Sequence, residues 1–288
     1  MDISSGKALR DAVKAETIQV PGAPNALAGR LIERMGFQAA YLSGAAFSSS
    51  VLGLPDIGLF TLSELVTQAK YLTQSVDIPV IVDADTGFGE AVNVERTVYE
   101  LESVDVAAIQ LEDQQLPKRC GHLSGKSLVS ADEMCAKLRT AASSKADPDL
   151  VIIARTDACG VTDFDDATDR AKRYLDAGAD WIFPEALADR DEFERFAKEV
   201  DAPLLANMTE FGKSPLLTKD DLAELGYAAI LYPVTLLRIA MRAAEAALGV
   251  IADEGTQQEL LDLMQSREEL YDLLDYQGFE EPDRTHFG

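Results

Sequence analysis

The sequence predicts an α/β protein of the (β/α)8-barrel class. Eight short, apolar, β-favouring runs recur at intervals of roughly 30 residues, and helical patterns lie between them. Polar residues follow the carboxyl ends of these runs, as they do at the catalytic rim of such a barrel. An open doubly wound sheet would need a phosphate-binding glycine fingerprint after its first strand, and VPGAPNALAG is not one. Eight repeats of strand and helix therefore favour a closed barrel.

The predicted strands are short stretches rich in Val, Ile, Leu and Ala. Several of them, such as PVIV, LVIIA and AAILY, are almost continuously hydrophobic, which is typical of parallel strands that are covered on both faces. In chain order they are expected at residues 17–20, 39–43, 79–83, 106–111, 150–154, 181–184, 203–206 and 228–232.

Helices are predicted between the strands by apolar residues at helical spacing, of which Val94, Val98 and Leu101 are one set. Glycine supplies the left-handed residue that ends a helix, and it precedes a predicted strand at Gly36, Gly178 and Gly226.

Two or three further helices are expected after the last strand, at about 237–248, 256–264 and 267–274. We expect residues 1–288 to form one barrel domain. The helices from about 237 onward should cap the barrel or pack on a neighbouring subunit.

Composition excludes several classes of protein. A net charge of -24 repels nucleic acid, and no basic cluster offers an exception. No apolar stretch is long enough to span a membrane, and the first residues lack the pattern of a secretory signal. Three cysteines without a CxxC pair predict neither a disulfide framework nor a zinc site. We expect a cytoplasmic protein that binds neither nucleic acid nor membrane.

The excess of acidic over basic residues also needs an explanation. The acidic residues are scattered over predicted helices with regular apolar positions, so they do not mark a disordered tail. High ionic strength screens the repulsion among such charges. We therefore expect the protein of a halophile.

Acidic side chains follow two adjacent predicted strands. Asp83 and Asp85 end the third strand, and Glu112 ends the fourth. A single Asp after a strand is most often a helix N-cap, but polar residues at six or seven strand ends are hard to explain as caps. Carboxylates without nearby His or Cys suit Mg²⁺, with Mn²⁺ as the alternative. We expect Asp85 to be the direct ligand.

One thiol is flanked by three potential cations. Cys120 lies in the segment KRCGH, between Lys118, Arg119 and His122. Positive neighbours lower the pKa of a thiol and prepare it for proton transfer. An inert, buried cysteine is the ordinary alternative, and it suits Cys135 better. His122 is either functional or a hydrogen-bonding loop residue.

Arginines in apolar surroundings are the expected anion binders. Arg155 follows VIIA, and Arg238 lies in another apolar run, where an unpaired cation would be costly. Guanidinium groups bind carboxylates through two parallel hydrogen bonds. An anionic chain needs such local cations to hold a substrate with several carboxylates.

These motifs resemble the isocitrate lyase/phosphoenolpyruvate mutase superfamily and, within it, the 2-methylisocitrate lyases. The resemblance covers nearly the whole chain, through segments in family order: YLSGAA, LGLPDIG, VDADTGFG, LEDQ, KRCGH, ARTDA, FPEA, LANMTEFGKSP, LYPVTLLR, EGTQ and REELY. The chain departs from the family at Ala45, where SGG is common, and after His122, where LSGK is nearer to isocitrate lyases.

The resemblance implies a homotetramer whose last helix is swapped between subunits, and a Mg²⁺-dependent cleavage of a tricarboxylate to pyruvate and succinate. It implies a metal site at Asp83, Asp85 and Glu112. The substrate contacts that it implies are Ser43, Gly44, Ala45, Cys120, Gly121, Arg155, Glu185, Asn207, Thr209, Arg238 and Arg267.

The roles follow from these assignments. Either Tyr41 or a metal-bound water removes the hydroxyl proton of the substrate. Arg238, Asn207 and Thr209 hold the succinate half, and Cys120 then protonates its carbon.

Other activities stay open. One is isocitrate lyase, which forms glyoxylate and succinate; another is a phosphonomutase or oxaloacetate-type hydrolase, for which a proton-donating cysteine is unnecessary. A carboxylate-binding protein without catalytic activity would not need Cys120. A single methyl group contributes only about 1–3 kcal/mol to substrate discrimination. The sequence therefore predicts the reaction type more firmly than the substrate.

Overall fold

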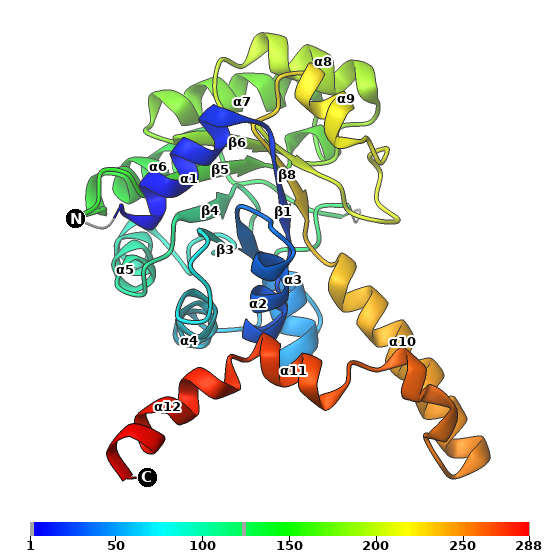
Figure 1. The fold of residues 1–288 in the computed structure, drawn as a ribbon. Coiled ribbons are helices and arrows are strands. Elements are labelled where there is room, and N and C mark those ends of the chain that lie inside the picture. Colours follow the sequence, from blue (N-terminus) through cyan, green and yellow to red (C-terminus); the bar gives the residue numbers. More distant parts are fainter. Residues whose placement is uncertain (1–2, 123–124, 288) are drawn as a thin grey trace.

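The barrel consists of eight parallel strands in the order of the sequence. The computed structural model describes residues 3–122 and 125–287 (Figure 1). Strands β2 to β6 form one ladder, and β1, β8 and β7 form another. Parallel bridges from Gly22 to Tyr41 and from Ile182 to Leu204 join the two ladders and close the barrel. The strands are β1 Ile18–Pro21, β2 Ala40–Leu42, β3 Val80–Asp83, β4 Ala108–Glu112, β5 Val151–Thr156, β6 Trp181–Pro184, β7 Leu205–Asn207 and β8 Ala229–Tyr232.

The eight strands confirm the sequence prediction to within two residues at each end. Their side chains are buried on both sides, as the continuous apolar runs require. Alternate residues such as Val20, Ile81 and Trp181 fill the inside of the barrel. Their neighbours, among them Val82 and Ile152, pack outward against the helices. The barrel interior is thus a packed core, and only its rim can hold a ligand.

Helices surround the barrel as predicted, and one precedes the first strand. Gly36, Gly178 and Gly226 follow helix ends with φ of 84°, 103° and 89°, in the left-handed region that stops a helix. The helices are α1 Ser5–Ala15, α2 Ala26–Arg34, α3 Gly44–Phe47, α4 Leu62–Thr73, α5 Ala91–Glu102, α6 Ala131–Ser144, α7 Phe164–Asp176, α8 Arg190–Glu199 and α9 Lys219–Glu224, with short turns η1 Ser48–Leu52 and η2 Ala158–Gly160.

The chain after β8 forms a C-terminal arm, residues 235–287, of α10 Thr235–Glu254, η3 Gln258–Leu263, α11 Arg267–Leu273 and α12 Tyr276–Phe287. In Figure 1, α10 projects away from the barrel and α11 returns beside α2. Arg34 on α2 pairs with Asp272 on α11 at 3.0 Å. Neither α10 nor α12 contains a buried residue, so these two helices do not cap the barrel of their own chain.

The helices of the described residues include none with the length and apolar character that a membrane span requires.

Candidate active site

A cavity of about 90 Å³ lies at the carboxyl ends of the strands. Side chains from β2 to β8 and from the connections after them line it. Among its lining residues are twelve of the site residues expected from the sequence: Tyr41, Ser43, Ala45, Asp83, Cys120, Gly121, His122, Arg155, Glu185, Asn207, Thr209 and Arg238. The strand order therefore brings together side chains that are up to 197 positions apart, from Tyr41 to Arg238.

The three expected metal ligands lie together beside this cavity. One carboxylate oxygen from each of Asp83, Asp85 and Glu112 lies within 4.8 Å of the others, and all three residues are buried. Asp83 and Glu112 end adjacent strands, and Asp85 follows β3 with a φ of 49°, an uncommon value outside glycine. The backbone turn thus aims Asp85 back toward the other two carboxylates.

The unsatisfied oxygens of this cluster suit a divalent cation. Oδ1 of Asp85 and both carboxylate oxygens of Glu112 are buried and accept no aligned hydrogen bond among the described residues. Their nearby cations are Lys118, 2.7 Å from Oδ1 of Asp85, and Arg155, 3.3 Å from Oε2 of Glu112. Burial raises the pKa of Asp85 to about 7 and that of Glu112 well above its ordinary value. Two cations near three buried carboxylates leave an excess of negative charge, which a bound divalent cation would balance. An all-oxygen donor set fits Mg²⁺.

Gly44 approaches the carboxylate cluster through its backbone. Its N–H donates to Oδ2 of Asp83 at 3.1 Å. A side chain at this position would place its Cβ 3.1 Å from an oxygen of Asp85 and 3.2 Å from one of Asp83. The neighbouring Ser43 accepts a hydrogen bond from Ala46 N–H at 3.3 Å as the N-cap of α3, and Ser43 and Ala45 line the cavity.

Tyr41 lies in the cavity, but its surroundings do not suit a base. The phenol donates a hydrogen bond to Gln110, whose amide donates to Oδ1 of Asp83 at 3.0 Å. Burial, together with the nearby carboxylates of which Asp83 acts most strongly, raises the pKa of Tyr41 well above its ordinary value. The phenol therefore stays protonated. Of the two bases expected from the sequence, Tyr41 or a metal-bound water, Tyr41 is the less suitable, because its phenol is a hydrogen-bond donor.

Cys120 borders the cavity and is partly exposed, but its flanking cations do not activate it as expected. Lys118 instead pairs with Asp56 and, at 2.7 Å, with Asp85. Burial raises the pKa of the Cys120 thiol, against smaller lowering effects from the His122 backbone N–H and from Arg155. The predicted fall in pKa is thus wrong. A protonated thiol is the form that can donate a proton.

His122 ties the segment around Cys120 to two other connections. Its Nδ1 accepts from the backbone N–H of Lys213 at 3.0 Å, so Nε2 carries the proton in the neutral ring and donates to Glu185 at 2.9 Å. Gly212 packs so closely on the ring that a Cβ there would lie 2.7 Å from Nδ1. His122 therefore holds Cys120 over the mouth of the barrel. Of the two roles left open, the contacts fit a hydrogen-bonding loop residue, one that positions Cys120.

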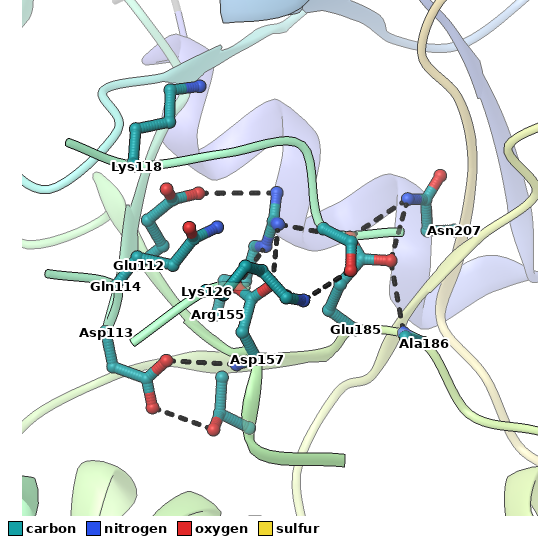
Figure 2. Close-up of polar contacts among 12 residues, drawn as sticks. Glu112, Asp113, Gln114, Lys118, Lys126, Arg155, Asp157, Glu185, Ala186 and Asn207 are labelled. Carbon is teal, nitrogen blue, oxygen red and sulfur yellow. Dashed lines mark hydrogen bonds and ion pairs between the residues drawn. The ribbon is translucent and has the colours of Figure 1, made fainter. Parts of the chain in front are cut away.

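Arg155 stands at the centre of the buried charges (Figure 2). It forms two hydrogen bonds with Asp157, at 2.9 and 3.0 Å, and lies 3.3 Å from Glu112 and 3.5 Å from Glu185. Burial acts to lower its pKa, but these three carboxylates raise it well above the ordinary value. The guanidinium also lies 5.2 Å from the ring centre of Phe183. Arg155 is a fixed cation at the cavity wall.

Glu185, Asn207 and Thr209 form the far side of the cavity. The Asn207 amide donates to Glu185 at 3.1 Å, and Thr209 donates to the Asn207 carbonyl oxygen at 2.9 Å. Burial acts to raise the pKa of Glu185, but Arg155 and His122 lower it to about 2. Glu185 is therefore ionised at neutral pH, and its carboxylate orients the hydrogen-bond donors around the cavity.

The two remaining arginines lie in different places. Arg238, at the start of α10, lines the cavity and donates to the Glu210 carbonyl oxygen at 2.8 Å. Arg267, at the start of α11, lines a separate cavity of the C-terminal arm with Tyr271 and Gln277. Arg267 thus does not reach the cavity of its own chain, because α10 carries it away from the barrel rim. Its contact with substrate stays a prediction.

Sequence reasoning did not single out some residues that the structure places in or behind the site. Asp56 lines the cavity and pairs with Lys118. Gln110 joins Tyr41 to Asp83, and Lys126 pairs with Asp157 at 2.6 Å. Asp56 and Lys126 come from connections rather than strand ends, so no rule based on strand ends finds them. The buried position of Gln110 within an apolar strand was a signal that could have been used.

Comparisons with known proteins agree with this geometry. The profile of the phosphoenolpyruvate phosphomutase family matches residues 9–252. The 2-methylisocitrate lyase of Aeropyrum pernix is 52% identical over 279 residues, which is 96% of this chain and 90% of that protein. A crystal structure of 2,3-dimethylmalate lyase, described as a member of the PEP mutase/isocitrate lyase superfamily, superposes with a TM-score of 0.94 at 31% identity and covers 100% of this chain and 97% of that one.

A structure of phosphonopyruvate hydrolase in complex with oxalate and Mg²⁺ has a TM-score of 0.90 at 29% identity, over 99% of this chain and 100% of that one. The family profile, the high identity and the shared architecture all point to one assignment. This chain belongs to the PEP mutase/isocitrate lyase superfamily and is a carbon–carbon lyase.

Proposed function

We propose that the protein cleaves 2-methylisocitrate to pyruvate and succinate with Mg²⁺, as a step of propionate breakdown in the methylcitrate cycle. One observation carries the proposal: a cluster of three buried carboxylates lies beside a cavity that is also bordered by a protonated thiol, Cys120. The Aeropyrum pernix relative bears the name of this activity. Mn²⁺ is the alternative metal.

The residues of the chain divide the work in the proposed reaction. Asp83, Asp85 and Glu112 would hold the Mg²⁺, which would supply a Lewis acid that stabilises negative charge on the pyruvate half. Tyr41 donates a hydrogen bond at the cavity wall rather than accepting a proton. The substrate hydroxyl proton therefore leaves to a water or to another cavity residue.

Cys120, His122 and the polar side chains opposite them act on the succinate half. Arg238, Asn207 and Thr209 offer hydrogen-bond donors for its carboxylates, and the carbon released by bond cleavage receives the thiol proton of Cys120. The remaining proposed substrate contacts are Ser43, Gly44, Ala45, Gly121, Arg155 and Glu185.

The proposed assembly and setting follow the same resemblance. We propose one lyase domain per chain, a homotetramer in which the C-terminal arm docks on a neighbouring subunit, and a cytoplasmic location. Exposed apolar residues on α10, among them Ile239, Leu248 and Ile251, support a partner for the arm. The described cysteines are free thiols, which suits a reducing compartment. A neighbouring subunit could then supply Arg267 to a site.

A substrate panel tests the proposal. Purified protein with Mg²⁺ is given 2-methylisocitrate, isocitrate or oxaloacetate, and the 2-oxo acid or oxalate that forms is identified. We expect pyruvate from 2-methylisocitrate at the highest kcat/KM. Faster formation of glyoxylate from isocitrate, or of oxalate from oxaloacetate, would replace the proposed substrate with that of isocitrate lyase or of the hydrolase branch.

A further inference from the structure

We propose that Lys126 and Asp157 are a pair of positioning residues that hold Cys120 over the cavity through the Gly121 carbonyl. The proposal rests on the proposed function for the role of Cys120 as proton donor. The pairing itself follows from contacts outside the cavity lining, because neither Lys126 nor Asp157 borders the ligand space.

The buried ammonium of Lys126 contacts the backbone next to the thiol. Its Nζ donates to the carbonyl oxygen of Gly121, the residue after Cys120, and to Oδ1 of Asp157 at 2.6 Å. Only 1% of the Lys126 side chain is exposed. Gly160 leaves room for the ammonium, since a Cβ there would lie 3.2 Å from Nζ. A buried ammonium is costly unless it is paired, so the Lys126 contacts with Gly121 and Asp157 are strongly favoured.

Asp157 joins this ammonium to Arg155. Its Oδ1 accepts from both Lys126 and Arg155, and its Oδ2 accepts from Arg155 at 2.9 Å (Figure 2). One fully buried carboxylate thus sets the positions of two cations. One of them lies at the cavity wall, and the other holds the segment of Cys120.

Asp157 is itself fixed from behind. Its backbone N–H donates to Oδ1 of Asp113 at 2.9 Å, while Thr156 and Tyr174 donate to the other oxygen of Asp113 at 2.8 and 2.7 Å. Asp113 is the first residue after β4, and Tyr174 lies on α7. The carboxylate of Asp157 is therefore anchored to the barrel and its helices, and the Gly121 carbonyl is the movable partner.

Gly121 transmits the position of Lys126 to the active site. It packs so closely that a Cβ on it would lie 2.4 Å from atoms of Arg155 and Glu185. Any shift of the Gly121 backbone therefore changes the position of the adjacent thiol. Without Lys126, the segment keeps the contacts of His122 with Glu185 and Lys213 and those of Arg119 with Gln114, but the Gly121 carbonyl loses its charged donor. We expect Cys120 to leave its place in a larger fraction of molecules.

Lys145 is a matched control that separates the positioning of Cys120 from general stabilisation of the fold. Lys145 likewise donates to a carbonyl, that of Leu150 at 2.8 Å, and to a carboxylate, that of Asp180 at 3.2 Å. It does so at the amino ends of β5 and β6, away from the cavity. Lys145→Met removes the same kind of contacts as Lys126→Met without touching the segment of Cys120.

Alkylation of Cys120 by iodoacetamide measures its position without any substrate. Wild type, Lys126→Met, Lys126→Arg, Asp157→Asn and Lys145→Met are treated at one pH, and alkylation is located by peptide mass spectrometry. We expect Lys126→Met to react at Cys120 about tenfold faster or more, as loss of hydrogen bonds to a charged group implies. Asp157→Asn should react at least about threefold faster, because it weakens the same pairing. Lys126→Arg should stay near wild type, and so should Lys145→Met.

Turnover gives the second readout. In Lys126→Met we expect kcat for pyruvate formation to fall about tenfold or more, with KM within about threefold, because the lysine acts on the thiol and does not line the cavity. Lys126→Arg should restore most of kcat. A merely structural lysine would change the fraction of active enzyme without changing alkylation relative to Lys145→Met.

Two results would overturn the pairing. One is alkylation of Cys120 at the wild-type rate in folded Lys126→Met, or in folded Asp157→Asn if the first variant does not fold. The other is equal acceleration in Lys145→Met. If alkylation follows our expectation but no variant, wild type included, forms pyruvate, the proposed function fails and the positioning pair stands.

Discussion

Nε2 of His122 lies 2.9 Å from Oε1 of Glu185 and joins the segment of Cys120 to the carboxyl end of β6. Glu185 also accepts from Asn207 and lies 3.5 Å from Arg155. One buried carboxylate thus connects the proposed proton donor, the anion-binding arginine and the amide opposite them. The side chains that line the cavity form one charged network. Replacing each of them should nevertheless have a distinct, measurable effect.

Replacement of the thiol should remove turnover and leave binding. We expect Cys120→Ser to lower kcat about 10²- to 10⁴-fold, the usual contribution of a positioned general acid, while substrate still binds within a few fold. Steady-state pyruvate formation and calorimetric titration check the two parts. Cys159→Ser is the matched control, because Cys159 lies in η2 and not along the cavity; it should keep wild-type turnover. Undiminished turnover in Cys120→Ser would count decisively against the thiol as acid.

Acid should weaken the folded protein through Glu185. Its pKa is about 2 in the fold and 4.5 without the fold's interactions, so its stabilising effect is present above pH 4.5 and is lost as the pH falls toward 2. The effect amounts to roughly 3 kcal/mol at most. Urea unfolding between pH 6 and pH 3 should show a shallower loss of stability in Glu185→Gln than in wild type. Equal slopes would mean that Glu185 is not held ionised by Arg155 and His122.

Magnesium should stabilise the protein through its carboxylate cluster. We expect the Tm measured after EDTA treatment to rise on addition of Mg²⁺, with a stabilisation of about 2.7 kcal/mol when Mg²⁺ is a hundredfold above its Kd. Activity should vanish with EDTA and return with Mg²⁺. Glu112→Gln should lose most of the Tm increase, whereas Glu95→Gln, on the exposed face of α5, should keep it. A rise of the same size in both variants would place the ion elsewhere.

Salt should stabilise this chain more than it stabilises ordinary proteins. A net charge of -24 produces mutual repulsion that ions screen within about 10 Å at 0.1 M and about 3 Å at 1 M. We expect the Tm to rise between dilute buffer and molar KCl. A constant or falling Tm would refute the expectation of a halophilic protein.

The C-terminal arm should hold subunits together. On α10, Leu248 is 66% exposed and Ile251 is 44% exposed, which is unusual for apolar residues of one helix. We expect wild type to be a tetramer by light scattering and the double variant Leu248→Asp/Ile251→Asp to form smaller species. Lys198→Asp, an exposed change on α8, should remain tetrameric. A monomeric wild type would contradict the proposed assembly.

Much of the fold could be predicted because a parallel barrel repeats one simple unit. Strands buried on both faces require continuous apolar runs, and helix ends such as Gly178 require a left-handed residue. The carboxylate cluster could be predicted for a similar reason, since Asp83 and Glu112 end neighbouring strands. Helix α1 has a local signal in its N-cap Ser4 and its buried Leu9, which could have been used. The direction of the C-terminal arm depends on packing that no local pattern contains.

The electrostatics of Cys120 could not be predicted from its sequence neighbours. Lys118 is two residues away along the chain, yet its ammonium pairs with Asp56 and Asp85. Burial then outweighs the nearby charges and raises the pKa of the thiol. The contacts of Lys126 with Asp157 are similarly invisible in the sequence, because 31 positions separate the two residues.

Gly121 and Gly212 limit how this barrel can be redesigned. Each lies where the first carbon of a side chain would overlap a neighbour, Arg155 and Glu185 in one case and His122 in the other. Libraries that vary these two positions would mostly yield enzymes with a permanently displaced thiol. Altered substrate preference must therefore come from changes elsewhere in the walls, with both glycines kept.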